Sequence, residues 1–160
     1  MEILITGGAG FIGSHILEQL NERPDMDVVV FDNLSSGSRD HVPARMELVE
    51  GDVCDEEAVD AVFADHHFDA VVHLAAQTMV PTSVEQPVLD CQINLEGVLH
   101  VLEACRTHGV PHILFSSSAA VYGDNLNIPL EETERLVPTS PYGITKMTTE
   151  HYLRVYLSLI

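Results

Sequence analysis

The chain has 160 residues, 46% of them hydrophobic, which suits about one domain with a sizeable core. Its 25 acidic and seven basic residues give a formal net charge of −18, which argues against nucleic acid as a partner. No apolar run approaches the roughly 20 residues that cross a bilayer, and the N-terminus lacks a signal-peptide pattern, so we expect a cytoplasmic protein without membrane contact.

The acidic residues are spread along the chain and do not form one tail. This distribution suits either a salt-adapted surface or an ordinary acidic cytosolic enzyme, and charge alone leaves both open. The three cysteines, Cys54, Cys91 and Cys105, are odd in number and widely spaced, so neither a disulfide framework nor a zinc site is indicated. We expect the histidines to be surface or capping residues, and no metal site.

The N-terminal segment joins an apolar run to a glycine-rich turn. Ile3-Leu4-Ile5 suits a strand buried on both faces of a parallel sheet. Gly8, Gly10 and Gly13 satisfy G-x-G-x-x-G, and Gly7, Gly10 and Gly13 satisfy G-x-x-G-x-x-G. Glycine permits a tight strand-to-helix turn and lets the backbone approach a pyrophosphate at the helix N-terminus. The segment therefore predicts a dinucleotide-binding loop.

An amphipathic helix and a second strand follow this loop. The strand Val28-Val29-Val30-Phe31 ends in Asp32, about 20 residues after Gly13. A carboxylate at this spacing is typical of one that hydrogen-bonds the adenosine ribose, and it would repel a 2′-phosphate. The pattern favours NAD over NADP. The alternative is a glycine-rich turn in some other α/β protein, with Asp32 as a loop residue.

Strands and helices continue to alternate along the chain. We expect a third strand over 46–50, closed by Gly51-Asp52-Val53, whose acid and apolar side chain suit an adenine amino group and ring face. Asp55 is placed to cap the next helix. A fourth strand, 69–74, is followed by Ala75-Ala76, small enough for a cofactor to press against. This alternation predicts an α/β fold with a Rossmann-type doubly wound parallel sheet.

A long helix is expected over 88–107, ended by Gly109. The fifth strand, 112–116, runs into Ser116-Ser117-Ser118, which places hydroxyl groups at the carboxyl end of a strand, where ligands bind in open α/β sheets. After a proline-containing irregular stretch, the helical pattern returns at Tyr142 and continues to the apolar Ile160. A helix that stops without a cap suggests a chain cut from a longer protein.

Tyr142 and Lys146 form the second informative pair. They are four residues apart and hence on one face of the last helix. A nearby ammonium stabilises a phenolate and lowers the tyrosine pKa, so Tyr142 is a candidate general base. Ser118, at the end of the fifth strand, is placed to hydrogen-bond the same substrate oxygen. By itself a Tyr-x-x-x-Lys spacing commonly joins two surface residues, but here it accompanies the glycine loop and Asp32.

Together these motifs resemble the extended short-chain dehydrogenase/reductase family. Within it the chain is most similar to the NAD-dependent nucleotide-sugar epimerases and dehydratases, the UDP-glucose 4-epimerases in particular. The resemblance covers all 160 residues. It rests on Thr6-Gly-Gly-Ala-Gly-Phe-Ile-Gly13, Asp32-Asn33, Gly51-Asp52-Val53, His73-Leu-Ala-Ala-Gln77, Ser83 with Pro87 and Asn94, Ser116-Ser-Ser-Ala-Ala-Val-Tyr-Gly123, and Pro141-Tyr-Gly-Ile-Thr-Lys146.

The resemblance implies two sets of site residues. The catalytic roles fall to Tyr142, Lys146 and Ser118. The NAD contacts fall to Gly7, Gly10, Phe11, Ile12, Gly13, Asp32, Asn33, Asp52, Val53, Leu74, Ala75, Ala76, Asn94, Tyr142 and Lys146. It further implies a homodimer that pairs through the helices at 88–107 and 142–160.

Two departures from the family pattern narrow the reaction. The related sugar 4,6-dehydratases carry Thr-Asp-Glu where this chain has Ser118-Ala119-Ala120, and alanines cannot supply the acid and base that an elimination needs. The glutamate that the decarboxylase relatives usually carry in this motif is missing as well. In addition, Leu89-Asp90-Cys91 stands where family members often have an aromatic residue.

The third departure is length. Family members continue past the catalytic helix into a further strand and a smaller domain that grips the nucleotide diphosphate. We therefore interpret residues 1–160 as an NAD-binding Rossmann domain that is incomplete at its C-terminus and lacks the substrate domain. Whether this chain is active alone stays open, and the residues that read the sugar and the nucleotide would lie beyond Ile160.

The leading functional hypothesis is a nucleotide-sugar 4-epimerase, with UDP-glucose and UDP-galactose as the expected pair. The resemblance implies that Tyr142 removes the proton of the sugar 4-hydroxyl, that hydride moves from C4 to NAD⁺, and that it returns to the other face after the ketosugar turns. One alternative is a non-catalytic NAD-binding module. Another is a nucleotide-sugar dehydrogenase, dehydratase or reductase.

Overall fold

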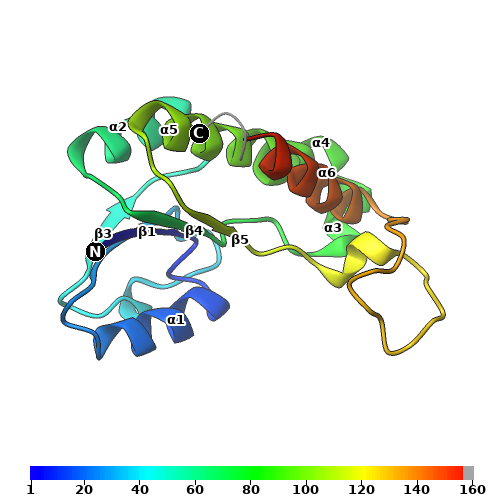
Figure 1. Cartoon of the computed structure of the whole chain (residues 1–160), viewed down its shortest axis with the longest axis horizontal. Helices are drawn as coiled ribbons and strands as arrows, with labels where there is room; N and C mark the ends of the chain where they lie inside the picture. The colour runs from blue at the N-terminus through cyan, green and yellow to red at the C-terminus, as the bar shows by residue number, and fades with distance from the viewer. Residues whose placement is uncertain (157–160) are drawn as a thin grey trace.

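Five parallel strands form one sheet in the computed structural model, which describes residues 1–156 (Figure 1). The order is β3-β2-β1-β4-β5. The strands are β1 (Glu2–Thr6), β2 (Asp27–Asp32), β3 (Glu47–Glu50), β4 (Ala70–His73) and β5 (Ile113–Phe115). In this register Thr6 pairs with both Phe31 and His73, and His73 pairs with Phe115. The carboxyl ends of four strands therefore lie side by side, and the parallel α/β prediction is confirmed.

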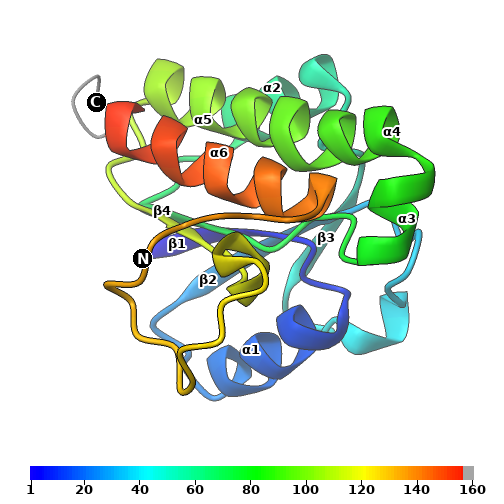
Figure 2. The same ribbon diagram turned by 90° about the vertical axis from the view of Figure 1, so that its right-hand side faces the viewer.

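Helices cover both faces of this sheet, as a doubly wound fold requires (Figure 2). Helix α1 (Phe11–Asn21) lies on one face, where Leu17 packs into an apolar cluster with Ile5 and Val30. Helices α2 (Glu56–Asp65) and α5 (Gly97–His108) lie on the other face. There the buried side chains form a second cluster, Leu4, Val29, Phe31, Val53, Val59, Val62, Phe63, Phe68, Val71, Val101, Ala104, Cys105 and Val110. Successive side chains of a strand point to opposite faces, so the apolar strands build one core on each face of the sheet.

The helix expected at 88–107 is present as one helical stretch made of three consecutive segments. It consists of α4 (Pro87–Cys91), a π-helical turn η2 (Gln92–Glu96) and α5. The π-helical turn was not expected from the sequence, and neither was the short helix α3 (Val80–Glu85) that precedes α4. Single π-helical turns within α-helices are frequent at functional sites.

Three further elements complete the described chain. Two short 3₁₀ helices are η1 (Arg39–His41) and η3 (Ala119–Tyr122). The last helix, α6 (Pro141–Tyr156), lies alongside α5 on the same side of the sheet (Figure 2). The helix expected at 142–160 is thus found over its described part, and the predicted positions of Leu159 and Ile160 lie outside the described residues.

Strand β5 forms one edge of the sheet, because among the described strands it pairs only with β4. Its Leu114 side chain is 58% exposed. Within residues 1–156, none of the helices combines the length and the apolar character that a membrane span requires.

Candidate functional site

The glycine loop turns where the carboxyl ends of β1 and β4 meet, the point at which an open α/β sheet binds its ligands. Gly7 has φ of +71°, and a Cβ there would lie 2.5 Å from the backbone nitrogen of Ala75. A Cβ on Gly13 would lie 2.5 Å from the Cα of Gly8. Both positions therefore require glycine, one for its backbone conformation and both for close packing.

Helix α1 starts immediately after this loop. Its N-cap residue is Gly10, in an extended conformation, and no side chain caps the first turn. No acidic residue stands in that turn either. Backbone N–H groups at a helix start favour an anion, and here a glycine cradle lies in front of them. The loop thus fits the pyrophosphate of a dinucleotide, as its spacing predicted.

Asp32 ends β2 beside this loop and is only 8% exposed. One carboxylate oxygen accepts a hydrogen bond from the backbone N–H of Ala9 at 2.9 Å, and the other accepts one from the N–H of Leu34 at 2.8 Å. Each oxygen retains acceptor capacity, because a carboxylate offers about four lone-pair sites. Asp32 therefore anchors the glycine loop and is still able to accept a ribose hydroxyl.

Asn33 and Asp52 join the loops that follow β2 and β3. The Asn33 amide donates to Asp52 Oδ2 at 2.8 Å, and the Cys54 N–H donates to Asp52 Oδ1 at 2.9 Å. Although partial burial opposes it, these hydrogen bonds hold the pKa of Asp52 below its ordinary value, so the carboxylate is charged. Two residues predicted to contact the cofactor, Asn33 and Asp52, thus lie together at the carboxyl end of the sheet.

Val53 differs from its neighbours, because it is 5% exposed and packs into the core against Gly97 of α5. Its carbonyl oxygen accepts a hydrogen bond from Nδ1 of His100 at 2.9 Å. The predicted contact of Val53 with an adenine ring stays a prediction. What the structure gives Val53 is a role in joining the β3 loop to α5.

The opposite side of the site is built by η3 and the start of α6. Ser118 caps η3, and its Oγ accepts a hydrogen bond from the N–H of Ala120 at 3.2 Å. A Cβ on Gly143 would lie 2.6 Å from the Ala120 carbonyl oxygen, so the glycine after Tyr142 lets α6 approach the serine-bearing segment closely. The structure thereby brings Ser118 and Tyr142 onto adjoining segments, as the sequence predicted.

Lys146 is buried beside Tyr142, with 4% exposure. Its Nζ donates to the carbonyl oxygen of Ser116 at 2.9 Å and lies 4.5 Å from the ring centroid of Phe115 and 5.9 Å from that of Tyr142. Burial lowers the pKa of Lys146 to about 8, against an opposing influence from Asp90. The ammonium is therefore mostly charged at neutral pH, and it lies beside the Tyr142 ring.

No role was predicted for His73, although it begins one of the motifs that carry the family resemblance. It lies at the end of β4, 1% exposed, between Thr6 and Phe115 in the row of paired residues. Its Nδ1 is 2.9 Å from Thr6 Oγ1, while Nε2 has no partner among the described residues. Burial and the charge of Lys146 lower the pKa of His73 to about 3, so the ring is neutral. The sequence signal for the burial of His73 was its position at the end of an apolar strand.

Leu74, Ala75 and Ala76, predicted to contact a cofactor, follow β4 and are all half-buried beside the glycine loop. Asn94 is different, being 1% exposed. Its amide accepts from the N–H of Gln77 at 2.9 Å and donates to the Gln77 carbonyl at 2.8 Å. Asn94 thus holds the loop after β4, and its contact with NAD stays a prediction.

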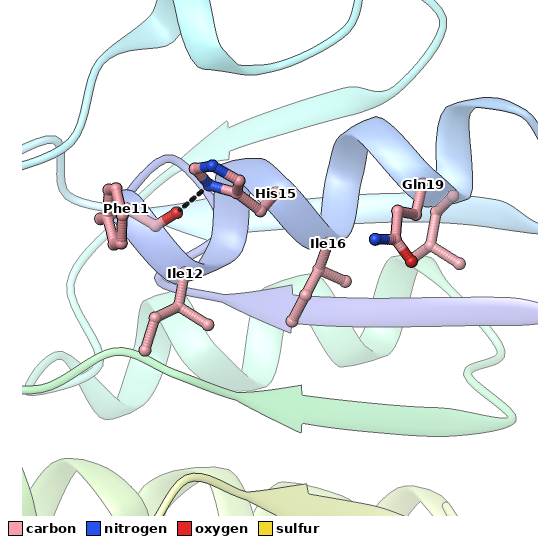
Figure 3. A pocket seen from close by; sticks show the side chains of 6 residues that line it. Phe11, Ile12, His15, Ile16 and Gln19 are labelled. Carbon is pink, nitrogen blue, oxygen red and sulfur yellow. Dashed lines mark hydrogen bonds between the residues drawn. The ribbon is translucent and has the colours of Figure 1, made fainter.

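A surface hollow of about 360 Å³ lies along one flank of α1 (Figure 3). It is lined by Phe11, Ile12, His15, Ile16, Gln19 and Leu20, all from this one helix. Phe11 and Ile12 are 81% and 55% exposed, so their side chains are open to solvent. The lining contains none of Asp32, Tyr142 and Lys146, so we assign this hollow no part in proton transfer. The contacts of Phe11 and Ile12 with NAD stay predictions. Among residues 1–156, no group of three metal-ligating side chains is close enough to hold a metal ion.

The arrangement places the glycine loop, the Asp32 carboxylate and the Tyr142–Lys146 pair at the carboxyl end of one parallel sheet. A dinucleotide lying across this end would have its phosphates at Gly7 to Gly13 and its far end near Tyr142 and Lys146. Proton transfer coupled to hydride transfer is the chemistry that such a set supports.

Comparisons with known proteins agree with this geometry. The model of the "NAD dependent epimerase/dehydratase family" matches residues 3–158. A UDP-glucose 4-epimerase of Azospirillum brasilense is 43% identical over 152 residues, which is 95% of this chain and 43% of that protein. The homologous enzyme of Lacticaseibacillus casei is 41% identical over 150 residues, 94% of this chain and 45% of the relative.

Two solved structures show the same architecture. The Thermus thermophilus UDP-glucose 4-epimerase, in complex with NAD, superposes with a TM-score of 0.93 at 46% identity, covering 98% of this chain and 50% of that one. The Thermotoga maritima enzyme with UDP-glucose gives a TM-score of 0.93 at 43% identity, with 98% and 51% covered. This chain thus spans about half the length of the relatives it matches. With a family model that matches nearly its whole length, the chain belongs to the NAD-dependent epimerase/dehydratase family.

Proposed function

We propose that this chain is the cofactor-binding domain of an NAD-dependent nucleotide-sugar 4-epimerase acting on UDP-glucose and UDP-galactose. The observation that carries the proposal is the position of the Lys146 ammonium, held by the Ser116 carbonyl next to the Tyr142 ring, at the same sheet edge as the glycine loop. Similar proteins from several organisms are UDP-glucose 4-epimerases, and one solved relative holds NAD.

In this proposal each residue has a separate task. NAD, when bound, supplies reversible hydride acceptance. Tyr142 takes the proton of the sugar 4-hydroxyl and returns it, and the Lys146 ammonium places a positive charge beside the ring of Tyr142. Ser118 donates a hydrogen bond to the same sugar oxygen, since its Oγ accepts from the Ala120 N–H and keeps its own proton to donate. The loop Gly7–Gly13 and Asp32 hold the dinucleotide.

The test is interconversion of UDP-glucose and UDP-galactose with catalytic NAD, in this chain and in a chain extended to the length of its relatives. Turnover without net reduced cofactor is expected in the extended chain. A dehydrogenase or reductase would instead accumulate or consume reduced cofactor, visible by its absorbance. Binding of NAD without any turnover in either chain would favour the non-catalytic module.

We predict that the chain binds NAD in preference to NADP, because a 2′-phosphate would meet the buried carboxylate of Asp32. Titration calorimetry with both cofactors measures the ratio of affinities. Asp32→Asn should reduce this ratio, whereas Asp40→Asn, which removes a charge at an exposed position, should leave it unchanged. Equal affinities of the unmodified chain for the two cofactors would refute the assignment of Asp32.

We also propose a homodimer that pairs through the helices at 88–107 and 142–160. Its support is an apolar surface on this part of the molecule: Val84 is 62% exposed, Val88 is 70% exposed and Ile144 is 49% exposed. Exposed apolar side chains that lie together often mark a surface that contacts another protein. Residues 157–160 of the second range lie outside the described residues.

We propose a cytoplasmic location as well, since all three cysteines, each within the described residues, are unpaired.

Light scattering tests the dimer. Val88→Glu should shift the mass toward that of a monomer, because each partner would bury an added carboxylate. Leu126→Glu is the matched control, since Leu126 is an aliphatic residue that is 90% exposed and far from these helices in the sequence. High salt should strengthen association by screening the charge of −18. A monomer at both low and high salt would disprove this assembly.

A further inference from the structure

Asp90, in helix α4, is a carboxylate with no exposed surface. Its Oδ1 accepts hydrogen bonds from Gln77 Nε2 at 2.8 Å and Asn94 Nδ2 at 3.0 Å. Its Oδ2 accepts one from Thr145 Oγ1 at 2.9 Å. Burying a carboxylate costs free energy unless hydrogen bonds or an opposite charge compensate, and these three donors supply the hydrogen bonds.

These bonds connect three segments that are distant in the sequence. Gln77 belongs to the loop after β4, Asn94 to the π-helical turn and Thr145 to α6. The π-helical turn and α6 are also joined directly, by a hydrogen bond from Thr149 Oγ1 to the Asn94 carbonyl at 3.2 Å. Thr145 directly precedes Lys146, so Asp90 fixes α6 at the residue next to the lysine.

Lys146 has few charged or titratable neighbours. The β5 segment contributes the Phe115 ring and the Ser116 carbonyl, both uncharged. Strand β4 contributes His73, which is neutral because its pKa is lowered to about 3. Tyr142 lies on α6 itself. Burial lowers the pKa of Lys146, and the charge of Asp90 acts in the opposite direction, the one anion within the described residues that does so.

We propose that Asp90 is the buried counter-charge and positioning residue of the Tyr142–Lys146 pair, holding α6 through Thr145 and keeping Lys146 in its ammonium form. The proposal rests on the proposed function for its catalytic meaning, but its structural part concerns this chain alone. Without Asp90, a lysine this deeply buried would lose its proton more readily and could no longer favour a phenolate at Tyr142.

The chain offers a direct test, because Lys146 is its only lysine. Incorporation of ¹³C-labelled lysine gives one side-chain signal, and its shift against pH reports the ionisation of Lys146 without assignment. Asp90→Asn should lower the Lys146 pKa by at least about 0.5 unit, since an anion that favours the ammonium has been removed. Glu85→Gln, which removes one charge at an exposed position of α3, is the matched control and should leave it unchanged.

The asparagine variant is expected to fold. Its amide oxygen replaces Oδ1 as the acceptor for Gln77 and Asn94, and its NH₂ group donates to Thr145 Oγ1, which keeps its own bond to the Tyr142 carbonyl at 3.0 Å. If circular dichroism shows that Asp90→Asn is unfolded, the salt dependence of the Lys146 pKa in the unmodified chain tests the proposal instead. A buried counter-charge leaves the Lys146 pKa nearly independent of salt, whereas a pKa governed by the charge of −18 over the whole surface falls as salt is raised.

In the extended chain, Asp90→Asn should move the alkaline limb of the kcat profile to lower pH, with little change in KM. A purely structural role would instead lower kcat equally at every pH. Absence of epimerase activity would contradict the proposed function while leaving the lysine titration valid. A Lys146 pKa that does not change in folded Asp90→Asn, or changes equally in Glu85→Gln, or falls steeply with salt in the unmodified chain, would overturn the role of Asp90.

Discussion

Tyr142→Phe should lower epimerase turnover by about 10²–10⁴-fold in a chain extended to the length of its relatives, which is the usual cost of losing a positioned general base. The phenylalanine keeps the ring that lies 5.9 Å from Lys146 Nζ but has no hydroxyl to exchange a proton with the sugar. Lys146→Met should reduce turnover nearly as far. The measurement is conversion of UDP-glucose to UDP-galactose at saturating substrate.

The control for both variants is Tyr152→Phe, on the same helix but 39% exposed. It should retain the activity of the unmodified protein, because Tyr152 lies about 15 Å from Tyr142 along the axis of α6. NAD affinity in Tyr142→Phe should change far less than turnover does. Turnover of Tyr142→Phe equal to that of the unmodified chain would contradict the mechanism while leaving the fold and the family unaffected.

Gly13→Ala is expected to destabilise the fold by about 1–3 kcal/mol, as overpacking of a closely packed site does. The new Cβ would lie 2.5 Å from both the Cα and the carbonyl oxygen of Gly8 and 2.6 Å from the Gly7 oxygen, all of them backbone atoms. The loop must therefore move as a whole, and NAD affinity should fall with it. Urea denaturation followed by circular dichroism measures the first effect, and calorimetry the second.

Gly10→Ala is the matched control within the same loop. Its Cβ would meet a single atom, the Gly7 oxygen at 3.3 Å, and its φ of −78° suits any residue. The free energy of unfolding should change much less than in Gly13→Ala, although a methyl group there can still hinder a phosphate. Equal stability of the two variants would show that close packing of α1 on the loop does not require glycine at position 13.

Much of the fold could be predicted from local pattern. Apolar runs marked all five strands within a residue or two, and Asp32 was correctly placed at the end of β2. The glycine spacing predicted a loop that the structure shows to be too tight for a side chain at Gly7 and Gly13. The spacing of Tyr142 and Lys146 sufficed to place both on one helix, because a helix brings residues four apart onto the same face.

The burial of Asp90, His73 and Lys146 could not be predicted in this way. A carboxylate in a helix normally indicates an exposed face, and Asp90 is buried only because α6, more than 50 residues later, packs against α4 and donates the hydroxyl of Thr145. The π-helical turn at Gln92–Glu96, which carries the Asn94 side chain into the same cluster, has no local pattern either.

By itself the sequence determined the strands, the glycine loop and the placing of Tyr142 and Lys146 on one helix, since these depend on residues close together in the chain. Only the tertiary structure decided the ionisation of Lys146. The pKa of Lys146 near 8 reflects its depth below the surface and the charge of Asp90, and both arise when α4, α6 and the end of β5 pack together. Electrostatic free energy depends on distance and burial in space, which spacing along the chain does not specify.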